Sequence, residues 1–352
     1  MASSDVTFNV SAEWAIIVPP DMPHAKKYID DLSRYIGILT GKPPAKVFKA
    51  TDSVPPGAII LLDSSFAVPG RNGFEWRAGQ DRVEISGESD RGLCNGIYSF
   101  LSALGISWPE AGKEKLPEAS PKDNPLIPLA QDSACEPSGF EGANPVALHL
   151  NRLVFGEKSA VKKALKNCQA FAAWAARNRY DTLIFPLKAF ASGGKRRKLL
   201  RLKQYVSEYE ISLEAGGWDL STLVPRKYFT FHRDYFRMEE GRRIKAHHFC
   251  PTSPGAVRLI AREGEKLFCE IDAEIFHLWP DKDSENVWCL CPACRAFTPQ
   301  EQNRLGVNAV ADALFAHKPG ASILYLEKPG ESSKIPLRKN VFKIERLPEE
   351  KK

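Results

Sequence analysis

Three carboxylates lie within five residues, directly after an apolar segment that ends in Trp-Pro. They are Asp281, Asp283 and Glu285, and the apolar segment spans 271–280. Two carboxyl groups can divide acid and base work at one bond if a low-polarity setting or a neighbouring charge keeps one of them protonated. A solvated acidic loop is the alternative interpretation, because charged loops are common on protein surfaces. The spacing indicates a candidate acid–base centre and leaves the surface loop open.

Three cysteines follow these acids in a C-x-C-x-x-C pattern. Cys289, Cys291 and Cys294 offer three thiolates, whereas a structural zinc site takes four ligands. Cys250 is the expected fourth ligand, because its loop precedes the helix that leads into the segment 271–280. One of the two histidines just before Cys250 is an alternative ligand. Plain reduced thiols, or one disulfide between Cys289 and Cys294, also fit the spacing. In each case the cysteines would fix the loop that carries the acids.

The elements that must position these residues alternate between strand and helix. Six apolar strand patterns with helical patterns between them follow one another at 147–155, 182–187, 211–217, 271–280, 322–328 and 340–347. Parallel β-α units in such a row predict a TIM-like barrel. A closed barrel has eight strands, so six leave it incomplete. An uncovered parallel edge favours covering by the C-terminal tail or assembly into a homo-oligomer.

A smaller α/β unit is predicted before the barrel. The length of 352 residues favours two domains, and residues 1–108 alternate between short buried strands and amphipathic helices. Neither a G-x-G-x-x-G nor a Walker sequence occurs there. The range 109–145 contains seven prolines and is predicted to be a linker, because proline fixes φ and lacks a backbone donor. The barrel domain then occupies 146–352, and the fold class is α/β.

Several segments resemble known families. WAIIVPPD (14–21), GAIILLD (57–63) and VEISGESDRGLCNGIYSFLSALGISWP (83–109) resemble the accessory domain that precedes the barrel in family 20 hexosaminidases and α-glucuronidases. The later segments LVPRKYFTFHRDYFRMEEGRRIKAHHFCPTSP (223–254) and WPDKDSENVWCLCPAC (279–294), with GVNAVADAL (306–314), resemble the bacterial domain family DUF4838. The resemblance implies a barrel like those of glycoside hydrolases and a carbohydrate substrate.

The resemblance also implies where the chemistry takes place. In such barrels the site lies at the C-terminal ends of the strands, where Asp281, Asp283 and Glu285 would be the catalytic carboxylates. The hexosaminidases carry adjacent Asp-Glu after their fourth strand. This sequence has Asp-Lys-Asp-Ser-Glu at that place, so hexosaminidase activity does not carry over. Two interpretations follow: a different glycosidase, or a non-catalytic carbohydrate-binding protein on a degenerate barrel.

Other residues near the strand ends are candidate contacts for a substrate. Trp279 and Trp288 flank the acids and would supply a low-polarity setting and a platform for a sugar ring. Arg152 and the basic run 195–198 would bind a carboxylate or sulfate on an acidic sugar. Of two adjacent histidines in a strand only one faces a given side. The complete set is Trp279, Trp288, Trp218, Asp219, Glu214, His248, Arg152, Tyr325 and Glu327.

Composition excludes several other classes of protein. The net charge of +6 is too small to imply a nucleic-acid partner, and the basic segment 188–203 is interpreted as a solvated helix face, with a site for an anionic partner as the alternative. No apolar run approaches the roughly 18 residues needed to cross a bilayer. No signal peptide is visible, so a cytoplasmic location and export followed by signal removal both stay open. Carboxylate chemistry needs no cofactor, and the cysteines make structural zinc the one cofactor to expect.

Overall fold

The chain forms two compact units. The computed structural model describes residues 7–8, 15–18, 26–41, 47–49, 58–63, 73–78, 82–87, 89–117, 127–128, 131–134, 152–156, 158–191, 193–281, 287–327, 333–344 and 349–350. The first unit comprises the chain up to Asn151 together with Asn167–Asp181 and Gln204–Ile211. The second comprises Arg152–Lys166, Thr182–Lys203 and Ser212–Lys352.

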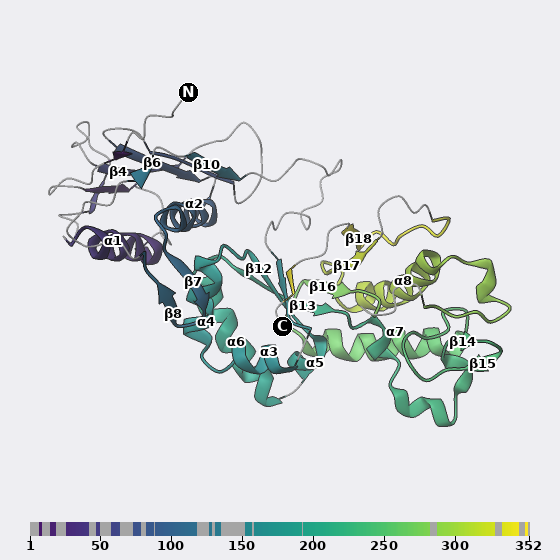
Figure 1. Cartoon of the computed structure of the whole chain (residues 1–352). Coiled ribbons are helices and arrows are strands. Elements are labelled where there is room, and N and C mark those ends of the chain that lie inside the picture. Colours follow the sequence, from purple (N-terminus) through teal and green to yellow (C-terminus); the bar gives the residue numbers. More distant parts are fainter. Residues whose placement is uncertain are drawn as a thin grey trace. The chain divides into compact units, whose positions relative to one another are not determined.

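A mixed six-stranded sheet in the order β10-β5-β6-β4-β2-β3 forms the centre of the first unit. Strands β2, β3, β4 and β6 run parallel, whereas β5 and β10 run antiparallel to their neighbours. Their bounds are β2 Ile16–Val18, β3 Val47–Lys49, β4 Ala58–Asp63, β5 Phe74–Ala78, β6 Arg82–Gly87 and β10 Gln131–Ala134. Helices α1 (Lys26–Thr40) and α2 (Asp90–Ala103) lie on the same face of this sheet (Figure 1).

Short strands within the proline-rich range 109–145 also belong to the first unit. Strand β7 (Ser107–Glu110) pairs with β8 (Lys113–Lys115), and β1 (Thr7–Phe8) pairs with β9 (Ile127–Pro128). Strand β10 lies at the edge of the six-stranded sheet, where fewer backbone donors are needed than in a central strand. The range predicted as a linker therefore contains strand segments that pair within this unit.

A buried ion pair fastens α2 to the residue that precedes strand β12 (Thr182–Phe185). Arg91 Nε lies 2.9 Å from Asp181 Oδ1, and both side chains are 1% exposed. Arg91 also donates to the carbonyl oxygen of Tyr180 at 2.8 Å, and Asn95 donates to Asp181 at 3.2 Å. The helix itself begins at Ser89, whose hydroxyl accepts from the backbone N–H of Gly92.

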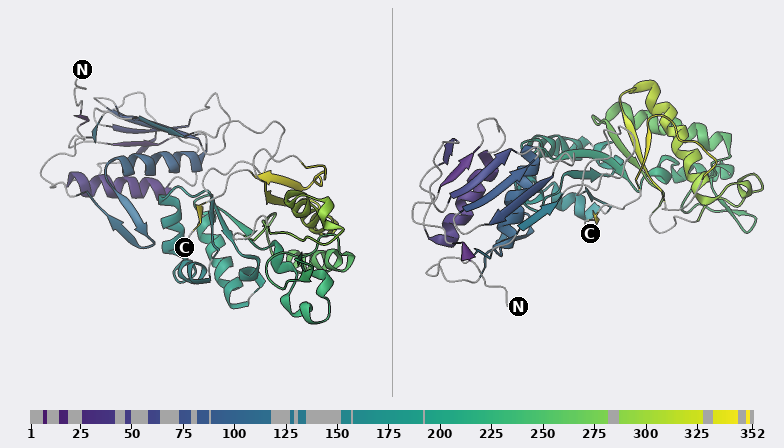
Figure 2. Two further views of the ribbon diagram at one scale, coloured as in Figure 1. Left: turned by 45° about the vertical axis from the view of Figure 1, so that its right-hand side comes forward. Right: turned by 90° about the horizontal axis from the view of Figure 1, so that it is seen from above.

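The second unit contains a seven-stranded sheet in the order β18-β17-β16-β13-β12-β11-β19, and every neighbouring pair is parallel (Figure 2). The strands are β11 Arg152–Val154, β12 Thr182–Phe185, β13 Ser212–Gly217, β16 Ile275–Leu278, β17 Ser322–Leu326, β18 Val341–Ile344 and β19 Glu349–Glu350. All six predicted barrel strands are present, and β19 is the addition. The predicted fold class, an α/β unit followed by an incomplete TIM-like barrel, is confirmed.

Chain length shows that this sheet curves. Strands β18 and β19 stand at opposite ends of the sheet, and six flat inter-strand steps would separate them by about 29 Å. The chain from Ile344 to Glu349 spans at most about 18 Å. The two ends of the sheet must therefore approach one another, as in a barrel. Within the described residues β18 and β19 do not pair, so the barrel stays open at this seam.

Helices and short 3₁₀ turns connect the parallel strands. Helices α7 and α8 lie side by side (Figures 1 and 2). None of the described helices is long and apolar enough to span a membrane. The helices are α3 Lys158–Ala164, α4 Cys168–Arg177, α5 Leu187–Ala191, α6 Gly193–Ser207, α7 Pro254–Glu270 and α8 Pro299–His317. Three 3₁₀ turns lie between β13 and α7: η1 Leu220–Leu223, η2 Arg226–Thr230 and η3 Arg233–Tyr235. They are followed by a hairpin of β14 (Met238–Glu239) and β15 (Arg242–Arg243). A further turn, η5 Cys294–Ala296, precedes α8.

The register separates side chains that face the helices from those that face the inside of the curved sheet. The ring of Phe276 in β16 lies 4.6 Å from that of Phe268 in α7, so Phe276 faces the helices. Successive strand residues point to opposite faces, so His277 faces inward. Leu324 of β17 pairs with His277 and shares its face. The next residue, Tyr325, therefore faces the helix layer.

Candidate functional site

The segments that follow β13 and β16 are bonded to each other at the C-terminal edge of the sheet. Gly217 accepts a backbone hydrogen bond from Trp279 at 2.9 Å, and Leu220 donates to Trp279 at 3.2 Å. Gly216 has φ +120°, and a Cβ there would lie 1.9 Å from the carbonyl oxygen of His277, so only glycine fits. This close approach brings the residues after the two strands together.

Two carboxylates lie in the segments that follow β13 and β16 at this edge, in different surroundings. The hydroxyl of Ser221 donates to Asp281, which is partly exposed. Asp219 is buried and accepts from the backbone N–H of Leu187 at 2.8 Å. Burial raises the pKa of Asp219, and the nearby charge of Asp281 raises it further. Burial lowers the pKa of Arg226, and the negative charge of Asp281 acts in the opposite direction.

A buried histidine–carboxylate pair lies inside the curved sheet next to this edge. His277 Nε2 is 2.5 Å from Glu214 Oε2, and the two side chains are 0% and 3% exposed. Ser212 donates to the other oxygen of Glu214 at 3.2 Å. Glu214 was among the predicted contacts, and His277 was not. The signal for His277 was its alternation with Phe276 and Leu278 in an otherwise apolar strand.

Three buried donors at this edge have no hydrogen-bond partner among the described residues. They are the indole N–H groups of Trp218 and Trp279 and the Nη1 group of Arg226. The other guanidinium nitrogen of Arg226 donates to the carbonyl oxygen of His247. A buried donor without an acceptor is costly, by about 1–3 kcal/mol. Such donors are therefore suited to the hydroxyl oxygens of a polar ligand.

Neither tryptophan beside the acids offers a free face to a sugar ring. Trp279 is completely buried, with its ring 5.2 Å from those of both Trp218 and His277. Trp288 is 3% exposed and stacks on His248 at 4.1 Å, with 7° between the planes. Each ring is covered by these neighbours, and the sugar platform at the two residues stays a prediction. The buried ring of Trp279 places apolar surface two residues before Asp281.

The predicted pair at the end of β17 lies in the helix layer. Arg304 of α8 donates to the hydroxyl of Tyr325 at 3.0 Å and to the carboxylate of Glu327, and Gln300 lies 3.4 Å from each of them. The register explains this direction, since Tyr325 and Glu327 alternate with the inward-facing Leu326. They anchor β17 to α8, and their expected role as substrate contacts stays a prediction.

The structure also corrects the position of Arg152. This residue begins β11 and pairs with Thr182, the first residue of β12, so it lies at the amino end of the sheet. The acid edge is at the opposite, carboxyl end, where β13 and β16 terminate. The role of Arg152 as a substrate contact therefore stays a prediction that its position does not favour. Asp283 and Glu285 lie outside the described residues.

The four predicted cysteines come together in one cluster. Cys250, Cys289, Cys291 and Cys294 are buried free thiols whose sulfurs lie within 4.8 Å of one another, so they could hold a metal ion. The side chain of Gln302 accepts from the backbone N–H of Cys289 at 3.1 Å and donates to the carbonyl oxygens of Cys289 and Cys294 at 3.2 and 3.3 Å. Gln302 thus holds the cysteine loop against α8, a role that the sequence analysis missed.

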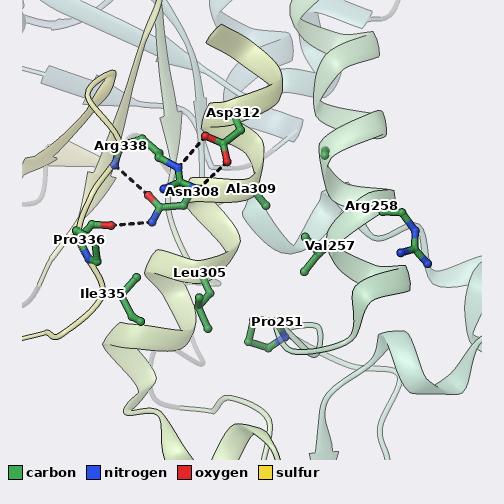
Figure 3. A pocket seen from close by; sticks show the side chains of 11 residues that line it. Pro251, Val257, Arg258, Leu305, Asn308, Ala309, Asp312, Ile335, Pro336 and Arg338 are labelled. Atoms are coloured by element: carbon green, nitrogen blue, oxygen red, sulfur yellow. Dashed lines mark hydrogen bonds and ion pairs between the residues drawn. The ribbon is translucent and has the colours of Figure 1, made fainter. Parts of the chain in front are cut away.

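A separate cavity of about 420 Å³ lies between α7, α8 and the segment 335–338 (Figure 3). Asn308 donates to the carbonyl oxygen of Pro336 at 2.8 Å, and Arg338 pairs with Asp312 at 2.7 Å on its wall. These residues lie in the helix layer, away from the inward face of the strands. The cavity is therefore distinct from the edge that holds the two carboxylates.

Comparison with solved structures gives the fold of the chain. It is similar to the chitobiase of Flavobacterium johnsoniae, with a TM-score of 0.53 and 13% identity over 97% of this chain and 52% of the other. It is also similar to the GH20 β-N-acetylhexosaminidase of Streptomyces coelicolor, with a TM-score of 0.51 and 9% identity over 97% of this chain and 66% of the other. The chain thus spans less than two thirds of either enzyme. At these identities the likeness shows the fold alone.

Comparison of sequences adds no family. No family model matches this chain, and no curated protein matches it.

Proposed function

We propose that this chain is a glycoside hydrolase of the DUF4838 type that cleaves an oligosaccharide or polysaccharide with carboxylates at the C-terminal edge of its barrel. The observation that carries the proposal is the hydrogen bond from Ser221, in the turn after β13, to Asp281, which follows the adjacent parallel strand β16. Active sites of such barrels lie at this edge. The similar enzymes support the same class of substrate, because they have a related fold and are named as a chitobiase and a β-N-acetylhexosaminidase.

The acids have different roles in this proposal. Asp281 is held by the Ser221 hydroxyl and acts as an ionised carboxylate, either as nucleophile or as base. Asp283 or Glu285 supplies the second carboxyl group, which protonates the leaving oxygen. Asp219 is a positioning residue in this proposal. Its carboxylate already accepts a hydrogen bond from the backbone N–H of Leu187 and so holds the turn after β13 in place.

Amide substitutions test the assignment. D281N, D283N and E285Q are assayed against a panel of aryl glycosides and oligosaccharides, beside the control D272N. Asp272 is an exposed acid before β16, at the opposite end of the same strand. We expect D281N and one of the other two variants to lower kcat at least about 100-fold. D272N should keep wild-type turnover. Full activity in all three amide variants would refute the proposal.

A non-catalytic carbohydrate-binding protein is the second candidate function. It is favoured by the open seam between β18 and β19 in the described part of the barrel. Calorimetry and a reducing-end assay on the same glycans separate the two candidates. Binding that D281N leaves intact, with no sugar released by the wild type, would favour the binding protein over the hydrolase.

A further inference from the structure

Four cysteine sulfurs from two separate segments meet inside the second unit. The sulfurs of Cys250, Cys289, Cys291 and Cys294 all lie within 4.8 Å of one another, and none of the residues is more than 4% exposed. We propose that these four residues bind one Zn²⁺ ion as thiolates. The site is separate from the carboxylates of the proposed hydrolase and has its own chemistry.

The distances between the sulfurs fit one tetrahedral ion. A Zn–S bond is about 2.3 Å long, so the sulfurs of a ZnS₄ tetrahedron stand about 3.8 Å apart. The sulfur of Cys250 lies 3.7 Å from that of Cys291 and 3.6 Å from that of Cys294. A disulfide would require about 2.05 Å. An iron–sulfur cluster spreads its cysteine ligands over several iron atoms, which places their sulfurs farther apart.

Hydrogen-bond donors point at the sulfurs, as expected around thiolate ligands. The backbone N–H of Met238 lies 3.3 Å from the sulfur of Cys289, and Arg243 Nη1 lies 3.7 Å from the same atom. The hydroxyl of Thr252 lies 3.0 Å from the sulfur of Cys294. Donors of this kind orient metal ligands and stabilise their charge. The guanidinium of Arg243 also offsets part of the net charge of −2 that Zn²⁺ and four thiolates carry together.

Four protein ligands make this a closed structural site. No coordination position is left for water or substrate, so the ion would have no catalytic role. The ligands join Cys250, four residues before the start of α7, to the segment between β16 and α8. Zinc would therefore tie together two connections of the barrel that are 39 residues apart at their nearest ligands, Cys250 and Cys289.

Metal content of the intact chain tests the proposal. The full chain is produced with added zinc and purified without chelator, and its metals are counted by mass spectrometry. We expect about one zinc per wild-type chain and at least a tenfold loss in C291S. The matched control is C269S, which changes an exposed cysteine of α7 outside the cluster and should keep its zinc. Replacement by Co²⁺ should give the intense visible absorption bands of a tetrahedral thiolate site.

The wild-type measurement keeps the test valid even if C291S fails to fold. A folded wild-type chain with less than about 0.1 zinc would overturn the proposal, as would about one iron in its place. Zinc retained in full by folded C250S and C291S would also contradict it. D281N should carry as much zinc as the wild type, so loss of activity with normal zinc separates the test of the hydrolase from the test of this site.

Discussion

The Arg91–Asp181 pair gives a quantitative test of the packing in the first unit. Both side chains are 1% exposed, and their closest atoms are 2.9 Å apart. The substitution D181N keeps the shape of the side chain but removes its charge, which leaves the guanidinium of Arg91 buried without a counter-charge. Breaking a buried pair in this way typically destabilises a protein by about 3–5 kcal/mol. The unfolding equilibrium constant of the unit should rise by about two to four orders of magnitude.

The matched control is a pair of the same kind at the surface of the same unit. Arg34 and Glu114 form two hydrogen bonds, at 2.5 and 3.1 Å, and their side chains are 45% and 32% exposed. The substitution E114Q should cost only about 0.2–1 kcal/mol, because water solvates the remaining charge. The contrast between the two variants isolates burial from the number of hydrogen bonds.

Hydrogen exchange of the α2 amides measures the stability of this unit directly, and a urea titration of the full chain supports it. A double variant, R91M with D181L, should recover much of the stability because it removes both charges together. If D181N costs no more than E114Q, the burial argument is refuted. A loss of 3 kcal/mol or more that the double variant does not reduce would show that packing, and not charge, explains the effect.

Three further predictions concern the glycines, the surface pair and the cysteine loop. G216A should cost more than about 3 kcal/mol in urea unfolding, because its Cβ would lie 1.9 Å from a backbone oxygen of β16, whereas G241A has no atom within 4 Å and should cost about 1 kcal/mol. The hydrogen bond from Arg34 lowers the pKa of Glu114 in the folded protein. The stability that this pair contributes is therefore present above the unfolded pKa of about 4.3 and is lost as pH falls through the lower folded pKa. The difference in stability between E114Q and wild type should disappear over that range, and a difference that stays constant with pH would contradict the linkage. Q302L removes an amide that bonds three backbone carbonyls and one N–H of the cysteine loop, and should lower stability by about 3 kcal/mol in thermal unfolding. Q302M also lacks the amide and should lose a similar amount, so wild-type stability in both variants would contradict the prediction.

The barrel strands could be predicted because apolar runs and their spacing are properties of the sequence. The directions of individual side chains depend on strand register, which the sequence does not show. Tyr325 and Glu327 face α8 because of how β17 pairs with β16, and Arg152 lies at the amino end because β11 begins there. The helical pattern between the first two barrel strands forms two helices, α3 and α4, because the side chain of Asn167 caps the start of the second. Asparagine is a favoured residue both at the start of a helix and in a turn, so the sequence alone does not show where one helix ends and the next begins.

The candidate acids and the cysteine cluster depend on the same stretch of chain. At one end, the backbone of Trp279 is bonded to Gly217 and Leu220, which fixes the start of the acid segment against the end of β13. At the other end, Cys289 is bonded to Gln302 and to Met238. The segment that carries the acids is therefore held on both sides by buried hydrogen bonds. An acid must be placed closely to act, and the first of these anchors lies two residues before Asp281.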